Sequence, residues 1–252
     1  MTQLSALFKQ LQNGTAPLPD YRHFSLYLQL IPMPENENHA CRRCGTCCRN
    51  GGPALHRDDI VLLRSGGISH ADLVTIRIGE PAHSPLIDRV EPSTYELIKL
   101  AGTGASWSCR FFSAGENRCL IYDERPLECR LLNCREPEAL LRVIGKNTVA
   151  RSDLINPADP VRSLIDEHEK RCSYAELNVL SGELKENGMN VRARNRLSDL
   201  LQVDIDLRRQ ALEHWRLPPA MEMFIFGRPL FLSVQQMGIT VVEENGRLQC
   251  RI

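Results

Sequence analysis

Four cysteines fall within eight residues, in the segment Cys41-Arg-Arg-Cys44-Gly-Thr-Cys47-Cys48. A two-residue gap lets a turn direct two thiolates at one metal, and Gly45 allows the tight backbone that such a turn needs. Isolated core cysteines behave as small hydrophobes and do not gather this densely. The chain must therefore fold around this segment, and the spacing predicts a metal-tied centre there.

Cys47 and Cys48 are adjacent in the sequence, and neighbouring side chains usually diverge. We therefore expect either that one of the two points away or that two metal sites share the segment. The C-x2-C-x2-C run is also the way in which bacterial ferredoxins hold a four-iron cluster. Here the fourth ligand has to come from elsewhere, because the later Cys-Pro of that pattern is missing.

A second group of cysteines follows at nearly even gaps, each beside a turn signal or an arginine. It consists of Cys109, Cys119, Cys129 and Cys134. The eight thiols together could supply two four-thiolate sites, or one multinuclear site with supporting thiols. Residues 41–135 also contain twelve arginines and a single lysine. Cationic neighbours favour thiolates, although an ordinary charged surface is an equal explanation.

Two further candidates lie in the C-terminal half. His168 and Cys172 are four residues apart in a helical pattern, so they share a face and could bind one metal. They are secondary candidates that could close the cluster, and an exposed histidine with a core cysteine is the alternative. Cys250 stands outside any pattern, and we expect it in the core.

The overall composition narrows the function classes. Lysine plus arginine equals aspartate plus glutamate at 31 each, which gives no reason to expect nucleic acid as a partner. The N-terminus is too polar for a secretory signal, and no apolar run is long enough to span a membrane. We therefore expect a cytoplasmic protein, where cysteines serve as metal ligands more often than as disulfides.

Hydrophobic periodicity predicts an α+β protein with an irregular, metal-stabilised cysteine-rich core and a largely α-helical C-terminal part. We expect three segments: an N-terminal helix and lead-in at 1–31, a cysteine-cluster domain at 40–136, and a mainly helical extension at 137–252. A strand is expected at 95–100. Helices are expected at 2–12, from Asp58 or Asp59 to Leu63, after Ser69, and at 138–144, 160–185, 191–215 and 229–237, with a hairpin turn at 244–246.

The cysteine pattern resembles a known family. The first segment, followed by Gly51-Gly52-Pro53, is similar to the opening of the YkgJ-type cysteine-cluster proteins, which are described as zinc- or iron-chelating domains. The stretch from Trp107 to Arg130, with Tyr122 and Arg125-Pro126 between Cys119 and Cys129, resembles the second half of that signature. The resemblance implies metal chelation through the matched cysteines. The sequence departs from the family pattern after Arg130. The family often continues with an aromatic residue and a proline, whereas here Leu131-Leu132-Asn133-Cys134 follows and adds a further thiol.

Three functions follow from these observations. The first is a cytosolic protein that holds an iron–sulfur cluster or Zn²⁺ in a structural or redox role. The CxxCxxC run with distant further cysteines favours iron–sulfur over zinc. The second is an enzyme like the flagellin lysine N-methylases, which carry a similar cluster, although no GxGxxG or CxxxCxxC motif supports it. The third is a zinc-stabilised protein-interaction module. Loss of Cys44 or Cys129 should destabilise the fold.

Overall fold

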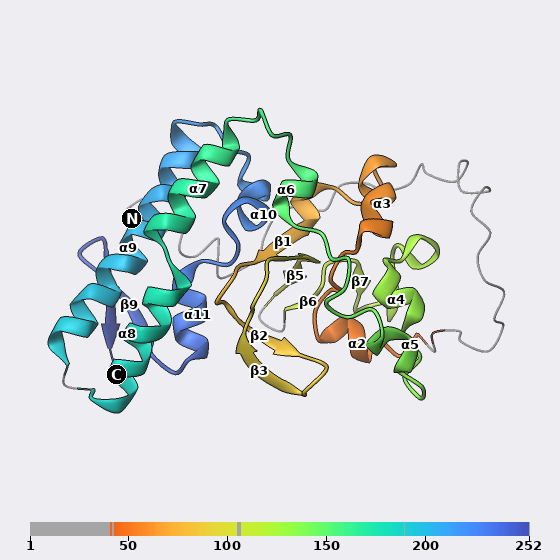
Figure 1. The fold of residues 1–252 in the computed structure, drawn as a ribbon, viewed down its shortest axis with the longest axis horizontal. Coiled ribbons are helices and arrows are strands. Elements are labelled where there is room, and N and C mark those ends of the chain that lie inside the picture. The colour runs from red at the N-terminus through yellow and green to blue at the C-terminus, as the bar shows by residue number, and fades with distance from the viewer. Residues whose placement is uncertain (1–40, 42, 105–106, 189, 252) are drawn as a thin grey trace. The chain divides into compact units, whose positions relative to one another are not determined.

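The computed structural model describes residues 41, 43–104, 107–188 and 190–251 (Figure 1). Helices and small two-stranded sheets make up the regular structure, and the C-terminal part is helical, so the predicted α+β class is confirmed. The predicted segment 1–31 and its helix at 2–12 lie outside the described residues. No helix in the described part of the chain has the length and apolar character required to cross a bilayer.

The described residues form two compact units, each built from two stretches of chain. We call residues 41–69 and 100–148 the thiol unit, because it holds all eight cysteines of the two groups. We call residues 70–99 and 149–251 the helical unit. The predicted division into 1–31, 40–136 and 137–252 stays a prediction.

Short elements make up the thiol unit. They are the helices α2 (Thr46–Arg49), α3 (Ile60–Arg64), α4 (Leu127–Leu131) and α5 (Glu138–Leu141), 3-10 turns at Arg57–Asp59 and Tyr122–Glu124, and the strands β5 (Gly102–Thr103), β6 (Ser108–Cys109), β7 (Phe112–Ser113) and β8 (Arg118–Cys119). Strand β5 pairs with β6, and β7 pairs with β8, both antiparallel. Cys109 lies opposite Gly102, and Cys119 lies opposite Phe112, so two successive small hairpins carry two of the thiols.

Longer helices dominate the helical unit. Its elements are β1 (Leu73–Ile76), β2 (Pro81–Ser84), β3 (Arg89–Pro92), β4 (Leu97–Leu100), α6 (Arg151–Leu154), α7 (Val161–Arg171), α8 (Tyr174–Glu186), α9 (Val191–Glu213), α10 (Glu222–Phe226), α11 (Leu230–Gln236), β9 (Thr240–Glu244) and β10 (Arg247–Arg251), with 3-10 turns at His70–Asp72 and Pro219–Met221. Strands β1 and β4 pair with each other, and β9 and β10 form the expected hairpin through Asn245 and Gly246. The core draws on Leu197, Leu201 and Ile205 of α9, all at most 3% exposed.

Two sequence expectations about these elements were wrong. The residues after Ser69 form a 3-10 turn and then strand β1, whose four residues are all buried, instead of a helix. A continuous buried apolar run does not distinguish a short strand from a helix by its period. The helix expected at 160–185 is two helices, because Cys172 leaves helical geometry at φ −121° and Ser173 is extended.

Candidate metal centre

The first cysteine segment folds into a tight turn followed by the short helix α2 (Figure 1). Gly45 precedes the helix with φ 76°, a left-handed conformation that L side chains rarely adopt. A Cβ atom at this position would lie 2.5 Å from the ring of Phe112. Glycine is therefore required at this position for the turn to pack against β7.

Cys47 and Cys48 point into the same neighbourhood although they are adjacent, and their Sγ atoms lie 3.9 Å apart. Burial raises the pKa of the Cys48 thiol to about 12, and Cys47, Cys109 and Cys119 add to the shift. Burial likewise raises the pKa of Cys47, with further contributions from Cys41 and Cys134. Each of the two thiols is electrostatically coupled to the second cysteine group, Cys47 to Cys134 and Cys48 to Cys109 and Cys119, and the number of metal sites that they serve stays a prediction.

The second group completes this set of thiols. Burial raises the pKa of Cys129 well above its usual range, and Cys109, Cys47, Cys119 and Cys48 raise it further. Burial also raises the pKa of Cys119, which interacts with Cys41 and Cys47. Electrostatic interactions thus connect seven of the eight predicted thiols, and we call this set the thiol cluster, although among the described residues no three of these sulfurs lie within 4.8 Å of one another. Its members are Cys41, Cys47, Cys48, Cys109, Cys119, Cys129 and Cys134.

Cys44 differs from these seven residues. Both Cys44 and Cys134 are exposed, but the Cys44 thiol donates a hydrogen bond to Thr46 Oγ1 at 3.4 Å, and no other cysteine contributes to its pKa shift. The contact with Thr46, with help from Arg49, lowers the pKa of this thiol, which is the opposite direction from Cys47, Cys48, Cys119 and Cys129. The even spacing of the motif does not reveal this difference.

Arginines and aromatic rings join the two cysteine-bearing segments. The guanidinium groups of Arg43 and Arg125 lie 4.1 Å and 3.7 Å from the ring centroid of Tyr122. Arg125 also donates to the Tyr122 carbonyl oxygen. Tyr122 therefore connects the two segments through cation–π contacts, which contribute roughly 0.5–1 kcal/mol each at exposed sites.

A second connection lies beside α2. Arg49 packs over the ring of Phe112 and donates to Asn117 Oδ1 at 2.9 Å. The Asn117 side chain in turn donates to the Arg43 carbonyl oxygen at 3.1 Å. These contacts hold the first cysteine segment against the β7–β8 hairpin, which ends at Cys119.

The charge of the thiol unit suits a polythiolate site. Residues 41–69 and 100–148 contain twelve arginines and lysines and eight aspartates and glutamates, an excess of four positive charges. The whole chain is neutral, so this excess is local. Positive charge close to ligating thiolates stabilises their charged form.

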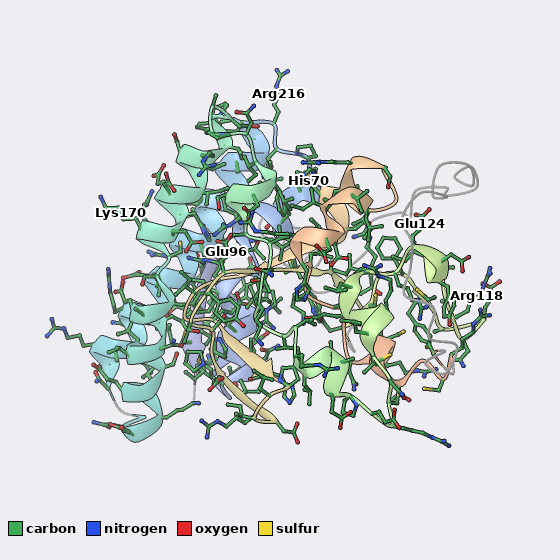
Figure 2. The ribbon with its side chains drawn as sticks, turned by 45° about the vertical axis from the view of Figure 1, so that its right-hand side comes forward. His70, Glu96, Arg118, Glu124, Lys170 and Arg216 are labelled. Carbon is green, nitrogen blue, oxygen red and sulfur yellow. The ribbon has the colours of Figure 1, made fainter. Side chains whose placement is uncertain are left out.

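His168 and Cys172 lie in the helical unit, where they meet Asp204 of α9. The potential ligand atoms of these three residues lie within 4.8 Å of one another, and all three side chains are fully buried. Lys170, on the same helix as His168, points outward (Figure 2). Asp204 is a member of this group that the sequence reasoning missed, because it lies 36 positions from His168 and no local motif connects them.

The contacts of Asp204 describe a buried charge network. Its Oδ1 accepts from His168 Nε2 at 2.7 Å and from Arg208 Nε at 2.8 Å, and its Oδ2 accepts from the Leu230 amide. Burial lowers the pKa of His168 to about 4, while the hydrogen bond to Asp204 opposes that shift. Burial raises the pKa of Asp204, but Arg208 and His168 outweigh it and hold the pKa well below its usual range. The carboxylate is thus already occupied, and a nearby guanidinium disfavours a further cation.

Comparison with known proteins supports the metal-centre interpretation. Residues 40–150 match the family model CxxCxxCC, described as a "putative zinc- or iron-chelating domain". The resemblance to YkgJ-type proteins is therefore confirmed over this segment, which includes all seven residues of the thiol cluster. No curated protein matches the chain, and no solved structure matches it.

Proposed function

We propose that this protein holds a metal centre in the thiol cluster, with an iron–sulfur cluster as the preferred occupant and Zn²⁺ as the alternative. The observation that carries the proposal is the match of residues 40–150 to a zinc- or iron-chelating domain, and the electrostatic coupling of seven thiols from two distant cysteine groups within that segment supports it. All ten cysteines of the described chain are free, so none of these sulfurs is committed to a disulfide.

The donor set fits such a centre. Thiolate sulfur is a soft ligand that selects zinc, copper(I) and iron–sulfur clusters over hard cations. Buried thiols with raised pKa values carry no charge near neutral pH, and a bound metal would provide the positive charge that makes their thiolates stable. Seven thiols exceed the four that one tetrahedral ion uses, which supports a multinuclear occupant.

The spacing of the first three cysteines supports iron–sulfur over zinc, because C-x2-C-x2-C is a cluster-wrapping arrangement. An iron–sulfur cluster would supply an electron-transfer centre, and zinc would supply a structural cross-link. In either case the arginines of the thiol unit offset the negative charge of the ligated sulfurs. We propose a structural or redox role in the cytoplasm, where such thiols remain reduced.

The decisive experiment is anaerobic purification of the full chain with metal and acid-labile sulfide analysis. Iron and sulfide in matching amounts, together with broad visible absorbance, are expected for the preferred occupant. Colourless protein with stoichiometric zinc would overturn the iron–sulfur choice. Protein that folds normally, contains no metal and takes up none would overturn the metal centre itself.

A further inference from the structure

Helix α4 carries Cys129, and its first turn is held by side chains from a distant part of the chain. The residue before the helix is Pro126, which offers no side-chain cap. The amide of Leu127 instead donates to Asp59 Oδ1 at 2.8 Å, from 68 positions away. Asp59 is fully buried, and its second oxygen accepts from the His56 amide at 2.9 Å. A remote carboxylate thus replaces the missing cap.

Glu128, the residue directly before Cys129, makes the reciprocal connection. Its Oε2 accepts from the Ala54 amide at 2.9 Å, and its Oε1 lies 3.3 Å from His56 Nε2. The other ring nitrogen of His56 lies 2.9 Å from the Lys146 carbonyl oxygen, to which it donates. The buried imidazole therefore links Glu128 to a third segment of the thiol unit, while the backbone amide of the same residue binds Asp59.

These contacts join the two halves of the thiol cluster. Ala54 and His56 follow Cys48 by six and eight residues, and Glu128 precedes Cys129 by one. Three contacts that involve no sulfur atom therefore hold the stretch after Cys48 against helix α4: Asp59 with the Leu127 amide, Glu128 with the Ala54 amide, and Glu128 with the His56 ring. Cys129 interacts with four other cysteines, so a shift of α4 would move it relative to all of them.

We propose that Asp59 and Glu128, linked by His56, are positioning residues that preset Cys129 for the metal centre. The proposal rests on the proposed metal binding. Groups that orient metal ligands without touching the metal typically contribute about 10- to 100-fold to metal affinity. Removal of either carboxylate function is expected to weaken metal binding by that factor.

The test compares four variants of the full chain. Glu128→Ala removes both acceptors, whereas Glu128→Gln keeps the size of the side chain and one oxygen acceptor, for the Ala54 amide. Asp59→Asn loses one of two acceptors, and Asp58→Asn, at the exposed neighbouring position, is the matched control. Each is titrated with Co²⁺, whose thiolate charge-transfer absorbance reports both affinity and the number of bound sulfurs.

We expect Glu128→Ala and Asp59→Asn to bind Co²⁺ about 10- to 100-fold more weakly than the unaltered chain. Glu128→Gln and Asp58→Asn should remain within a few-fold of it. Equal affinity and an unchanged spectrum for Glu128→Ala would overturn the positioning role. Circular dichroism identifies any variant that does not fold, and Asp59→Asn, which removes an acceptor while it keeps the size of the side chain, is the test if Glu128→Ala is unfolded.

A second measurement separates this proposal from the metal centre. In metal-free protein, amide hydrogen exchange at Ala54 and Leu127 should accelerate in Glu128→Ala and Asp59→Asn and stay unchanged in Asp58→Asn. If the unaltered chain binds no metal, the proposed function fails while this exchange result can still hold. If amide exchange at Ala54 and Leu127 does not change in these variants, the hydrogen bonds from Asp59 and Glu128 do not hold helix α4. The positioning role then fails even when the metal is bound.

Discussion

The set of metal ligands is tested most directly by two serine variants, one at a thiol inside the thiol cluster and one at Cys44, which lies outside that set. Cys47→Ser removes a member of the thiol cluster, while Cys44→Ser changes an exposed residue of the same motif. Serine at position 44 can retain the hydrogen bond to Thr46 Oγ1. The two variants therefore differ in ligand role but not in chemistry or in sequence neighbourhood.

The expected magnitude follows from the energy of thiolate sites. Metal binding to small structural sites contributes about 10–16 kcal/mol, so one of four ligands is worth roughly 3 kcal/mol. That corresponds to a loss of affinity greater than about a hundredfold for Cys47→Ser. Cys44→Ser should stay within about twofold of the unaltered chain, because no other cysteine contributes to the pKa shift of this exposed thiol; this expectation replaces the one from the sequence alone, that loss of Cys44 destabilises the fold.

The assay is competition of bound zinc or cobalt with a chelator of known affinity, followed by elemental analysis. Thermal unfolding with and without metal provides an independent measure, because ligand binding raises the stability of the folded state. Equal losses for Cys44→Ser and Cys47→Ser would refute the seven-thiol set. An unchanged affinity for Cys47→Ser would refute the role of the thiol cluster in metal binding.

Three further predictions concern proton linkage and the buried charges. Metal uptake at neutral pH should release protons, because burial raises the pKa of Cys48 to about 12 and a ligating thiol has to lose its proton. Calorimetry in two buffers of different ionisation enthalpy measures the number of protons released, and metal uptake without proton release would contradict this prediction. Asp204→Asn should lower the free energy of unfolding, measured in urea, by about 3–5 kcal/mol, because it leaves Arg208 buried without its carboxylate partner. Asp206→Asn, at a half-exposed position, is the control, and equal losses for the two variants would contradict the buried charge network. Metal-free protein should lose stability as pH falls from about 6.5 to about 4, because unfolded His168 takes up a proton that the buried ring does not; a flat profile in this window would be inconsistent with the lowered pKa.

Local patterns in the sequence predict much of this architecture. The density of cysteines indicates where the thiol cluster forms, and the apolar period of 191–215 indicates α9. The hairpin at Asn245 and Gly246 follows from turn chemistry, since both residues have positive φ in the structure. These features depend on interactions between near neighbours.

Other features depend on distant contacts and have no local signal. Asp59 and Glu128 read in the sequence as ordinary charged residues, and only the fold brings them to Leu127 and Ala54. Cys44 has the same spacing as its motif neighbours, and nothing in that spacing indicates that its side chain is exposed. The break at Cys172 interrupts an apolar pattern that continues on both sides.

The construction of the thiol unit from two stretches of chain has a consequence for biosynthesis. Sixty-one positions separate Cys48 from Cys109, so the first four thiols emerge from the ribosome well before their partners. At synthesis rates of about 5–20 residues per second, that delay is roughly 3–12 s. During this interval the first four cysteines belong to an incomplete chain in which the second group has not yet been synthesised. Oxidants would reach these thiols readily at that stage. Oxidation of the first group within this interval would remove ligands before the second group is available, so assembly of the thiol cluster depends on a reducing environment during synthesis.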